Sequence, residues 1–244
     1  MLNTAIADLQ IIFERDPAAR NWLEVLFCYP GFQAIFCYRV AHWLHCRRLP
    51  FIPRLISHLA RFLTGIEIHP GAKIGKGILI DHGMGVVIGE TAIVGDFAMI
   101  YQEVTLGGTG KESGKRHPTL GENVIVGAGA KVLGNINIGD RVRIGAGSVV
   151  LRDIPANCTV VGIPGRIVYP KGQSGDFLDY TRLPDAEAQA IKALLERIKS
   201  LEQQIELLKV QRGLPSAASA DLEMLAQTNS SNHLIEEFLD GSGI

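Results

Sequence analysis

Aliphatic residues recur at every sixth position through the middle of the chain. These mark positions are Ile68, Ile74, Ile80, Ile88, Val94, Ile100, Leu106, Leu120, Val126, Val132, Ile138, Ile144 and Val150. The rhythm slips by two residues after Ile80 and is interrupted by a loop after Leu106. Four residues after a mark the side chain is usually small or β-branched, as at Ala72, Ala92, Ala98, Val104, Val124, Ala130, Val142 and Ser148. A coil of three short strands repeats in this way, because each flat face contributes one inward aliphatic residue and one tight turn. The spacing predicts a left-handed parallel β-helix over residues 66–170, a known exception to right-handed crossovers.

The segment before this repeat has helical spacing. Its first apolar stripe is Ile6, Leu9, Ile12 and Phe13. Asp16-Pro17 marks a break, with Pro17 suited to the first turn of a helix. A second helix is expected after Pro30-Gly31. Another is expected after Pro53, with one apolar face formed by Leu55, Leu59, Phe62 and Leu63. Residues 1–65 are therefore predicted to form an N-terminal helical domain.

The segment after the repeat changes character again. The string GQSGDF reads as a linker, and residues 185–211 carry an apolar seam in alternating threes and fours: Ile191, Leu194, Ile198, Leu201, Ile205 and Leu208. Such a seam fits either an amphipathic helix packed on its own domain or a coiled coil. Residues 216–232 are polar and small, which is typical of a mobile segment. Residues 171–244 are predicted to form a linker, a helix and a flexible tail. With the N-terminal helices and the β-helix, the fold class of the whole chain is α+β.

Composition narrows the class of partner. The formal net charge of −1 provides no overall field toward nucleic acid or an anionic membrane. The four cysteines form no C-x-x-C and are too few for a disulfide framework, which favours a reducing cytoplasm. Acidic residues near the N-terminus argue against a signal peptide. The most apolar stretch, residues 22–44, is interrupted by polar residues and proline, so it is a poor transmembrane candidate.

Candidate chemistry lies where the six-residue rhythm breaks. The slip contains Asp81-His82-Gly83-Met84-Gly85, and the loop of residues 107–119 carries Arg116-His117. A structural turn or a solvated loop explains either feature alone. Together with Glu67 they supply an orienting carboxylate, a base and a cation that binds carboxylates. Because solenoid sites usually lie where copies meet, both breaks are expected to project into a groove of a homotrimer.

Longer strings are more specific than the repeat. They are RDPAA, GFQAIFCYRVAHWL, EIHPGAKIG, IDHGMGVVIGETA, VTLGGTGK, KRHPTLG, GAGAKVLG, IGAGSVVL and VVGIPGRIV. On these strings the chain resembles bacterial and plant-type serine O-acetyltransferases from Asp16 through Ile167. The resemblance implies transfer of the acetyl group of acetyl-CoA to the hydroxyl of L-serine for cysteine synthesis, with feedback inhibition by L-cysteine. It implies acetyl-CoA as a co-substrate, with no tightly bound cofactor and no metal.

The resemblance also implies a role for each site residue. His82 corresponds to the general base, and Glu67 stands where the family usually has the aspartate that orients it. Glutamate keeps the carboxylate but is one methylene longer, which alters the geometry. The remaining matches are Asp16 and Asp81 for the serine ammonium, Arg116 and His117 for its carboxylate, and Gly108, Ala128 and Ala146 for acetyl-CoA. A planar Arg suits a carboxylate because two parallel N–H donors engage both oxygens.

The implied partners are further copies of the chain and one other enzyme. The family forms trimers, and its N-terminal helices join two trimers into a hexamer. Members that end in isoleucine insert this residue into O-acetylserine sulfhydrylase, which assigns partner binding to Ile244. Capture of a C-terminal carboxylate is a known recognition mode, and Gly241 and Gly243 would let the end of the chain bend into a cleft.

Three other interpretations remain open at this stage. A trimeric β-helix zinc enzyme of the carbonic-anhydrase type needs three histidines, including a closely spaced pair, whereas the repeat contains only His69, His82 and His117, far apart in sequence. A hexapeptide acetyltransferase for a sugar, an antibiotic or homoserine shares the fold and the base but lacks the helical part with Asp16. A scaffold without activity leaves the occurrence of His82, Arg116 and His117 in matching strings unexplained.

Overall fold

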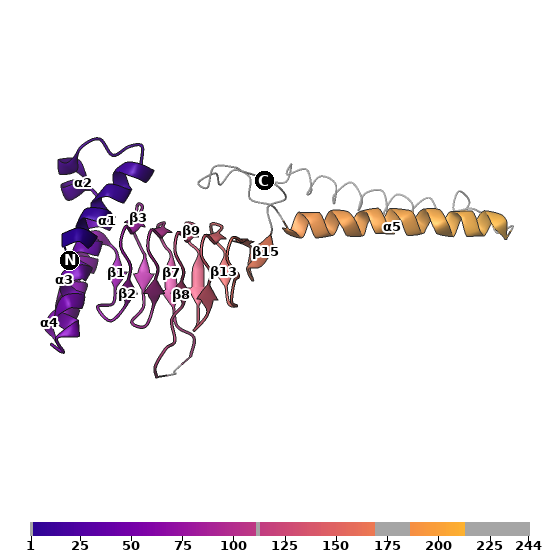
Figure 1. The fold of residues 1–244 in the computed structure, drawn as a ribbon. Helices are drawn as coiled ribbons and strands as arrows, with labels where there is room; N and C mark the ends of the chain where they lie inside the picture. Colours follow the sequence, from indigo (N-terminus) through magenta and orange to yellow (C-terminus); the bar gives the residue numbers. More distant parts are fainter. Residues whose placement is uncertain (1, 111–112, 169–185, 213–244) are drawn as a thin grey trace. The chain divides into compact units, whose positions relative to one another are not determined.

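A computed structural model describes residues 2–110, 113–168 and 186–212 (Figure 1). The chain divides into two units, residues 1–184 and 185–244, which are described separately. In the first unit, four helices precede a stack of short strands. The described ranges contain no helix with both the length and the apolar character needed to span a bilayer.

The four helices lie at one end of the stack (Figure 1). They are α1 (Leu2–Arg15), α2 (Trp22–Cys28), α3 (Pro30–Cys46) and α4 (Ile52–Thr64). The expectation that Pro17 opens a helix is wrong, because α2 begins only at Trp22. The cap of α2 is Asn21, whose side chain accepts the Glu24 N–H at 2.9 Å. The helix α3 begins at Pro30 itself, where the missing N–H costs nothing.

Helix α4 buries its small residues and exposes its apolar ones. Its buried residues are Pro53, Ser57, Ala60 and Thr64. The Ser57 hydroxyl donates to the Ile68 carbonyl at 2.6 Å, which ties α4 to the first coil. The predicted apolar face, by contrast, is exposed along its whole length at Leu55, Leu59, Phe62 and Leu63. In a single chain this face is open to solvent.

The strands form three parallel sheets that share one coiled path. Sheet A holds β1 (Glu67–Ile68), β4 (Val87–Ile88), β7 (Thr105–Gly107), β10 (Lys131–Leu133) and β13 (Val149–Val150). Sheet B holds β2 (Lys73–Ile74), β5 (Ile93–Val94), β8 (Thr119–Leu120) and β11 (Asn137–Ile138). Sheet C holds β3 (Leu79–Ile80), β6 (Met99–Ile100), β9 (Ile125–Val126), β12 (Arg143–Ile144), β14 (Thr159–Val161) and the antiparallel β15 (Arg166–Val168). From β1 to β13 consecutive strands lie in different sheets, so each strand pairs with the strand three places earlier in the chain.

The strand register shows where the extra residues go. Val87 pairs with Thr105, 18 residues or three hexads further on. Glu67 pairs with Val87 at 20 residues, so the turn between β3 and β4 absorbs the two-residue slip. Ile93 pairs with Thr119 at 26 residues, and the additional residues leave the stack as the long connection between β7 and β8 (Figure 1). Both insertions fall in turns, so the coils above and below them keep their spacing.

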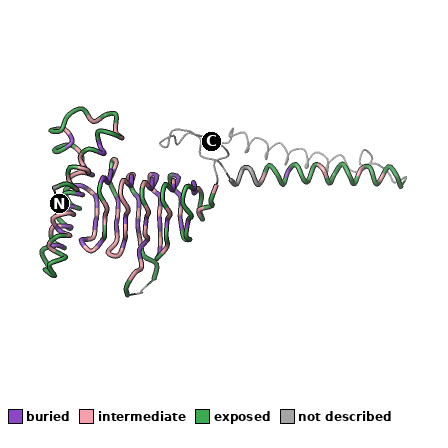
Figure 2. Tube along the Cα trace, viewed as in Figure 1, coloured by how far each residue is buried: buried purple, intermediate pink, exposed green. Residues whose placement is uncertain are grey.

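The mark positions form the core of the β-helix. All of them are buried except Ile74, which is half-buried, and buried residues occur in every coil (Figure 2). The small residues four places later, from Ala72 to Ser148, are also buried. Each fully buried Ile or Val side chain contributes about 1.5–3 kcal/mol relative to exposure, so the repeat itself stabilises the stack. The prediction of N-terminal helices followed by a parallel β-helix is confirmed.

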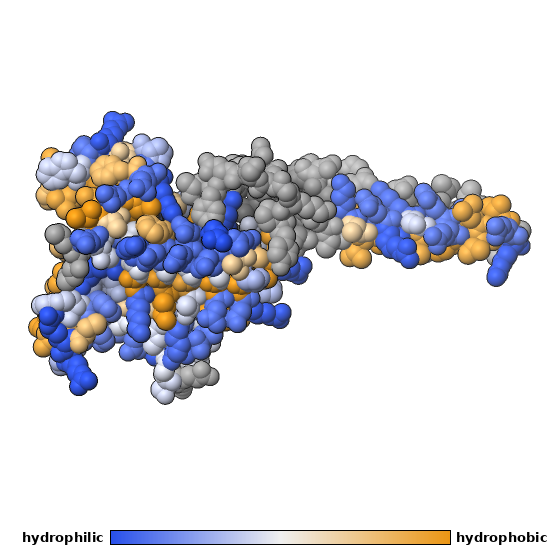
Figure 3. Space-filling model, viewed as in Figure 1, coloured by the Kyte–Doolittle hydropathy of each residue, from blue (hydrophilic) through white to orange (hydrophobic). Residues whose placement is uncertain are grey.

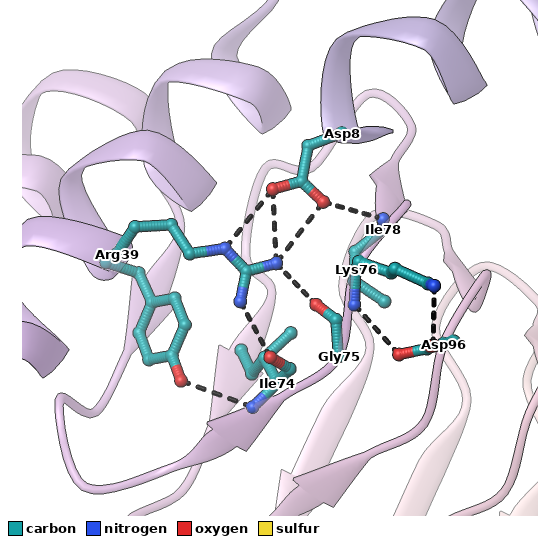
Figure 4. A network of polar contacts seen from close by, with 8 residues as sticks. Asp8, Arg39, Ile74, Gly75, Lys76, Ile78 and Asp96 are labelled. Atoms are coloured by element: carbon teal, nitrogen blue, oxygen red, sulfur yellow. Dashed lines mark hydrogen bonds and ion pairs between the residues drawn. The ribbon is translucent and has the colours of Figure 1, made fainter. Parts of the chain in front are cut away.

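A buried ion pair attaches the helices to the first coils (Figure 4). Arg39 of α3 and Asp8 of α1 pair at 3.1 Å, with side chains only 11% and 2% exposed. Arg39 also donates to the carbonyls of Ile74, at 2.6 Å, and Gly75, while Asp8 accepts the Ile78 N–H at 3.1 Å. Burial raises the pKa of Asp8, against the opposing effect of the Arg39 charge. The pair therefore depends on its full set of hydrogen bonds.

In the second unit the described residues form one helix, α5 (Ala186–Gln211). Along the predicted seam, Leu194, Ile198, Leu201, Ile205 and Leu208 are all exposed. Packing on its own domain and coiled-coil formation both stay predictions for this helix.

Candidate functional site

The turn that absorbs the slip carries His82 in a left-handed backbone conformation. The φ of His82 is +58°, and turn residues of later coils such as Phe97 and Glu103 take nearly the same value. The turn is fixed by Gly83, where an added Cβ would lie 2.4 Å from Ile66 Cδ1. The imidazole is 75% exposed, with Nε2 4.0 Å from Asp81 Oδ1. The exposure of the imidazole beside a carboxylate, rather than the backbone conformation, makes this turn a candidate site.

Two carboxylates and a phenol lie beside this turn. The Tyr29 hydroxyl donates to Asp16 Oδ2 at 2.7 Å, and the Ala18 N–H donates to Asp16 Oδ1 at 2.8 Å. Burial raises the pKa of Asp81, and the negative charge of Asp16 raises it further, although His82 acts in the opposite direction. Burial, the hydrogen bond to Asp16 and nearby acids raise the pKa of Tyr29 to about 12. Two mutually repelling carboxylates favour a bound cation.

Tyr29 is a residue that the sequence did not single out. It lies just outside the matching string that begins at Gly31, and it is separated from Asp16 by 13 residues along the sequence. No spacing rule connects a residue between two helices with one after a third, so the sequence carries no signal for this contact.

Glu67 is engaged by a residue other than His82. Its Oε2 lies 3.1 Å from Arg61 Nη1 of α4, and the Glu67 side chain is 31% exposed. Within the described residues, Glu67 therefore pairs with Arg61, and the carboxylate within 4.0 Å of the His82 ring belongs to Asp81. The structure does not bring the Glu67 and His82 side chains together as a pair.

The long connection returns to the stack at Arg116-His117. Arg116 Nη2 lies 2.5 Å from Glu90 Oε2, and this bond lowers the pKa of Glu90. His117 is 8% exposed, and its ring lies where an added Cβ on Gly89 would come within 2.0 Å. Glycine at 89 is thus the condition for this ring position. Burial, followed by the charges of Arg116 and Lys115, lowers the pKa of His117.

The site residues occupy two different edges of the three-sided stack. The edge between sheets C and A, called the His82 edge, consists of turns 81–86, 101–104, 127–130 and 145–148. The edge between sheets A and B, called the His117 edge, consists of turns 69–72, 89–92 and 134–136 and of residues 108–110 and 113–118 of the long connection. Asp81, His82, Ala128 and Ala146 lie on the first edge. Gly108, Arg116 and His117 lie on the second.

The His82 edge leaves its backbone accessible beyond the turn of His82. Ala128 is half-buried and Ala146 is exposed, and each precedes a glycine with φ near +70°. An added Cβ at Gly147 would meet no atom within 4 Å. On the other edge, an added Cβ at Gly108 would lie 3.2 Å from the Arg116 carbonyl. The His82 edge therefore leaves room for a ligand beside Gly147, whereas Gly108 packs closely against the returning loop.

Two further sequence-based expectations concern a metal ion and the C-terminal residue Ile244. Among residues 2–110, 113–168 and 186–212, no group of three or more His, Cys, Asp or Glu side chains is arranged to hold a metal ion. Ile244 lies outside the described residues.

Comparison with known proteins identifies close relatives. A family model described as serine acetyltransferase, N-terminal, matches residues 1–37, and one described as bacterial transferase hexapeptide (six repeats) matches residues 117–152. The serine acetyltransferase of Synechococcus elongatus is 66% identical over 248 residues, covering 100% of both chains. A soybean serine acetyltransferase complexed with serine superposes with a TM-score of 0.66 at 48% identity, covering 68% of each chain. A serine acetyltransferase in complex with cysteine gives 0.67 at 45% identity, covering 68% of this chain and 69% of the other.

Proposed function

The chain belongs to the serine acetyltransferase family, and we propose that His82 is the general base of its reaction. The imidazole takes the proton of the L-serine hydroxyl as that oxygen attacks the thioester carbonyl of acetyl-CoA. The C–S bond then breaks, and the departing thiolate of CoA receives the proton from His82. The products are O-acetyl-L-serine and CoA. Acid–base help of this kind is typically worth about 10²–10⁴-fold.

The observation that carries this proposal is the pair of acids next to an exposed imidazole. After burial, the charge of Asp16 also raises the pKa of Asp81, and Asp81 adjoins His82 in the chain. A serine ammonium bound between these carboxylates brings the hydroxyl, three bonds away, within reach of His82. Tyr29 steadies Asp16 through its hydrogen bond of 2.7 Å. The arrangement selects an acceptor with an amino group.

The serine carboxylate is assigned to Arg116 and His117. These residues lie on the His117 edge, whereas the acids and His82 lie on or beside the His82 edge. The ammonium and carboxylate of one amino acid are attached to the same carbon, so the two edges must come from neighbouring copies. The site is therefore completed in a homotrimer, in which the His82 edge of each copy faces the His117 edge of the next.

Acetyl-CoA is assigned to the groove between these edges. Gly108, Ala128 and Ala146 line it, and their small side chains leave a track for the pantetheine arm. Glu67 is assigned to orient His82, although it is paired with Arg61 in the single chain. L-Cysteine differs from L-serine by sulfur for oxygen, so the same acids and cations accept it as a competitive inhibitor.

The two terminal segments of the chain are assigned to larger assemblies, a hexamer and a complex with a second enzyme. Exposed apolar residues of α2, including Trp22, Leu23 and Phe27, supply a surface on which two trimers meet as a hexamer. Figure 3 shows hydrophobic side chains on the surface of the N-terminal helices. The C-terminal Ile244 is assigned to O-acetylserine sulfhydrylase.

The acceptor is tested by measuring thiol release from acetyl-CoA with serine, homoserine and simple sugars side by side. The base is tested by the same assay on a variant of His82. We expect His82→Ala to lose about 10²–10⁴-fold in turnover. The matched control is His58→Ala, which removes an exposed histidine of α4 and should leave turnover unchanged. Normal turnover of a folded His82→Ala protein would disprove the role of His82.

The shared site is tested by mixing two inactive proteins. His82→Ala and Arg116→Ala chains, unfolded and refolded together, form mixed trimers in which some interfaces combine an intact His82 edge with an intact His117 edge. We expect activity to return in the mixture, while each variant alone stays inactive. A mixture without activity, despite mixed trimers in sedimentation and mass measurements, would place the whole site within one chain.

A further inference from the structure

Thr91 lies in the turn after β4 and contacts the returning loop at four points. Its hydroxyl oxygen accepts the backbone N–H of Arg116 at 3.0 Å and that of His117 at 3.1 Å. The same oxygen lies 2.9 Å from Nδ1 of the His117 ring. The Thr91 backbone N–H donates to this Nδ1 at 3.2 Å. One residue thus contacts both the backbone and the ring of a residue 26 positions away.

The hydrogen-bonding capacity of these groups fixes the direction of each bond. A hydroxyl has two lone pairs and one hydrogen. Both lone pairs of Thr91 Oγ1 are used by backbone N–H groups, so its hydrogen points to His117 Nδ1. The Thr91 backbone N–H is also a donor. Because Nδ1 faces two donors it must be an acceptor, and the proton of the neutral ring is on Nε2.

The surroundings of the ring oppose a second proton. An imidazolium would carry N–H groups at both nitrogens, and the one at Nδ1 would face the two donors of Thr91. Burial and the charges of Arg116 and Lys115 disfavour the charged ring, against the opposing effect of Glu90, and His69 is a further titrating neighbour. The opposite edge of the ring faces glycines, since added Cβ atoms at Gly89 and Gly108 would lie 2.0 and 3.5 Å from Nε2.

We propose that Thr91 is a positioning residue that locks His117 as the neutral Nε2–H tautomer, so that the ring serves as an uncharged hydrogen-bond donor. In the trimer this donor faces the serine carboxylate beside Arg116. His117 is then a binding group and cannot act as a second base, because its only free nitrogen already carries a proton. The part concerning serine rests on the proposed function, whereas the tautomer is a property of the chain itself.

The tautomer is measured directly by long-range ¹H–¹⁵N spectra of the full-length protein labelled with ¹⁵N-histidine. The His117 signals are assigned by comparison with His117→Gln. We expect an unprotonated Nδ1 and a protonated Nε2 at neutral pH, with the ring gaining a second proton only at a lower pH than an ordinary histidine does. A ring protonated on Nδ1, or an imidazolium at neutral pH, would overturn the proposal without any reference to catalysis.

The role of Thr91 is measured with Thr91→Val, which keeps the branched shape and removes the hydroxyl. We expect the KM for serine to rise about tenfold, the usual effect of losing such a bond, with the KM for acetyl-CoA little changed and His117 titrating at higher pH. Thr91→Ser keeps the hydroxyl and should restore both the KM for serine and the His117 titration. Thr119→Val removes a hydroxyl from β8, the partner of β5, and is the matched control, which should leave both unchanged. If the His117 titration and the KM for serine are the same in Thr91→Val as in the unmodified protein, Thr91 does not position the ring.

Discussion

Arg116 Nη2 and Glu90 Oε2 form an ion pair at 2.5 Å across two turns of the His117 edge. Glu90 is adjacent to Thr91, so two consecutive residues of one coil hold the two consecutive residues assigned to the serine carboxylate. The glutamate orients the guanidinium, but its charge also opposes a second carboxylate at the same place. Orientation and charge can be separated by substitution.

We expect Glu90→Gln to lower the KM for serine about two- to fivefold. The amide oxygen still accepts from Arg116, whereas a negative charge a few ångströms from the substrate carboxylate, worth about 1 kcal/mol in water, is gone. Glu90→Ala removes the acceptor as well and should raise the KM. Steady-state kinetics at low and high salt provide the measurement. Equal changes in the two variants would contradict the separation of the two effects.

Tyr29→Phe should raise the KM for serine about three- to tenfold and change kcat little. The substitution removes the hydroxyl that donates to Asp16 at 2.7 Å, a bond worth about 0.5–1.5 kcal/mol. The control is inhibition by 3-hydroxypropionate, which has the hydroxyl and carboxylate of serine but no ammonium. Its inhibition constant should be the same in both proteins. A parallel change for serine and this analogue would mean that Tyr29 does not act through the ammonium site.

His69 is expected to make the protein less stable in mild acid. Burial, followed by the charge of Arg54, lowers its pKa from 6.5 to about 4, and its Nδ1 accepts the Gly71 N–H at 2.9 Å. Between these two values the unfolded chain binds a proton that the folded chain does not, so the free energy of unfolding falls as the pH is lowered. His69→Asn keeps an acceptor for Gly71 but does not titrate. Urea unfolding is measured above and below the two pKa values of His69. The free energy of unfolding should fall less in the variant than in the unmodified protein as the pH is lowered, and an identical fall would exclude His69 as the cause.

Ser148→Ala should raise the free energy of unfolding by about 1 kcal/mol. Ser148 is 1% exposed, and its hydroxyl has no hydrogen-bond partner within the described part of the chain. Ala130, one coil earlier, occupies the equivalent place because Lys131 pairs with Val149. Ala130→Ser is therefore the reverse experiment, and thermal unfolding should show it to be less stable. If both substitutions, or neither, stabilise the protein, the buried hydroxyl does not lower the free energy of unfolding.

Much of the fold follows from the sequence because the six-residue rhythm is local. Each mark such as Val94 or Ile144 is buried by the coil that its own neighbours form. Helix α4 is harder to interpret, because its buried face is decided by the approach of β1 and α3. Small residues such as Ser57 and Ala60 are buried where α4 meets these elements, whereas Phe62 is exposed.

The sequence singles out candidate site residues where they interrupt the rhythm, and it gives no signal for residues that keep the rhythm. The breaks single out His82 and Arg116-His117. Glu90 and Thr91 follow the mark Ile88 in an ordinary hexad, so nothing in their spacing indicates that they hold a loop one coil later. The division of the site residues between two edges is likewise set by the number of strands in each coil, which only the paired register makes explicit.

The reversed direction of β15 limits how copies of this protein associate. A parallel coil leaves backbone donors and acceptors free at its last turn, and another coil of the same direction can continue the ladder. Here Thr159 of β14 pairs with Val168 of a strand that runs backwards, and helices α3 and α4 contact β1 at the other end (Figure 1). A parallel strand of another copy therefore cannot extend sheet C beyond β14, and the helices cover the first strand of sheet A. End-to-end growth of the stack into a fibre is thereby disfavoured, whereas closed assemblies that use the flanks of the stack or the exposed faces of the helices stay open to the protein.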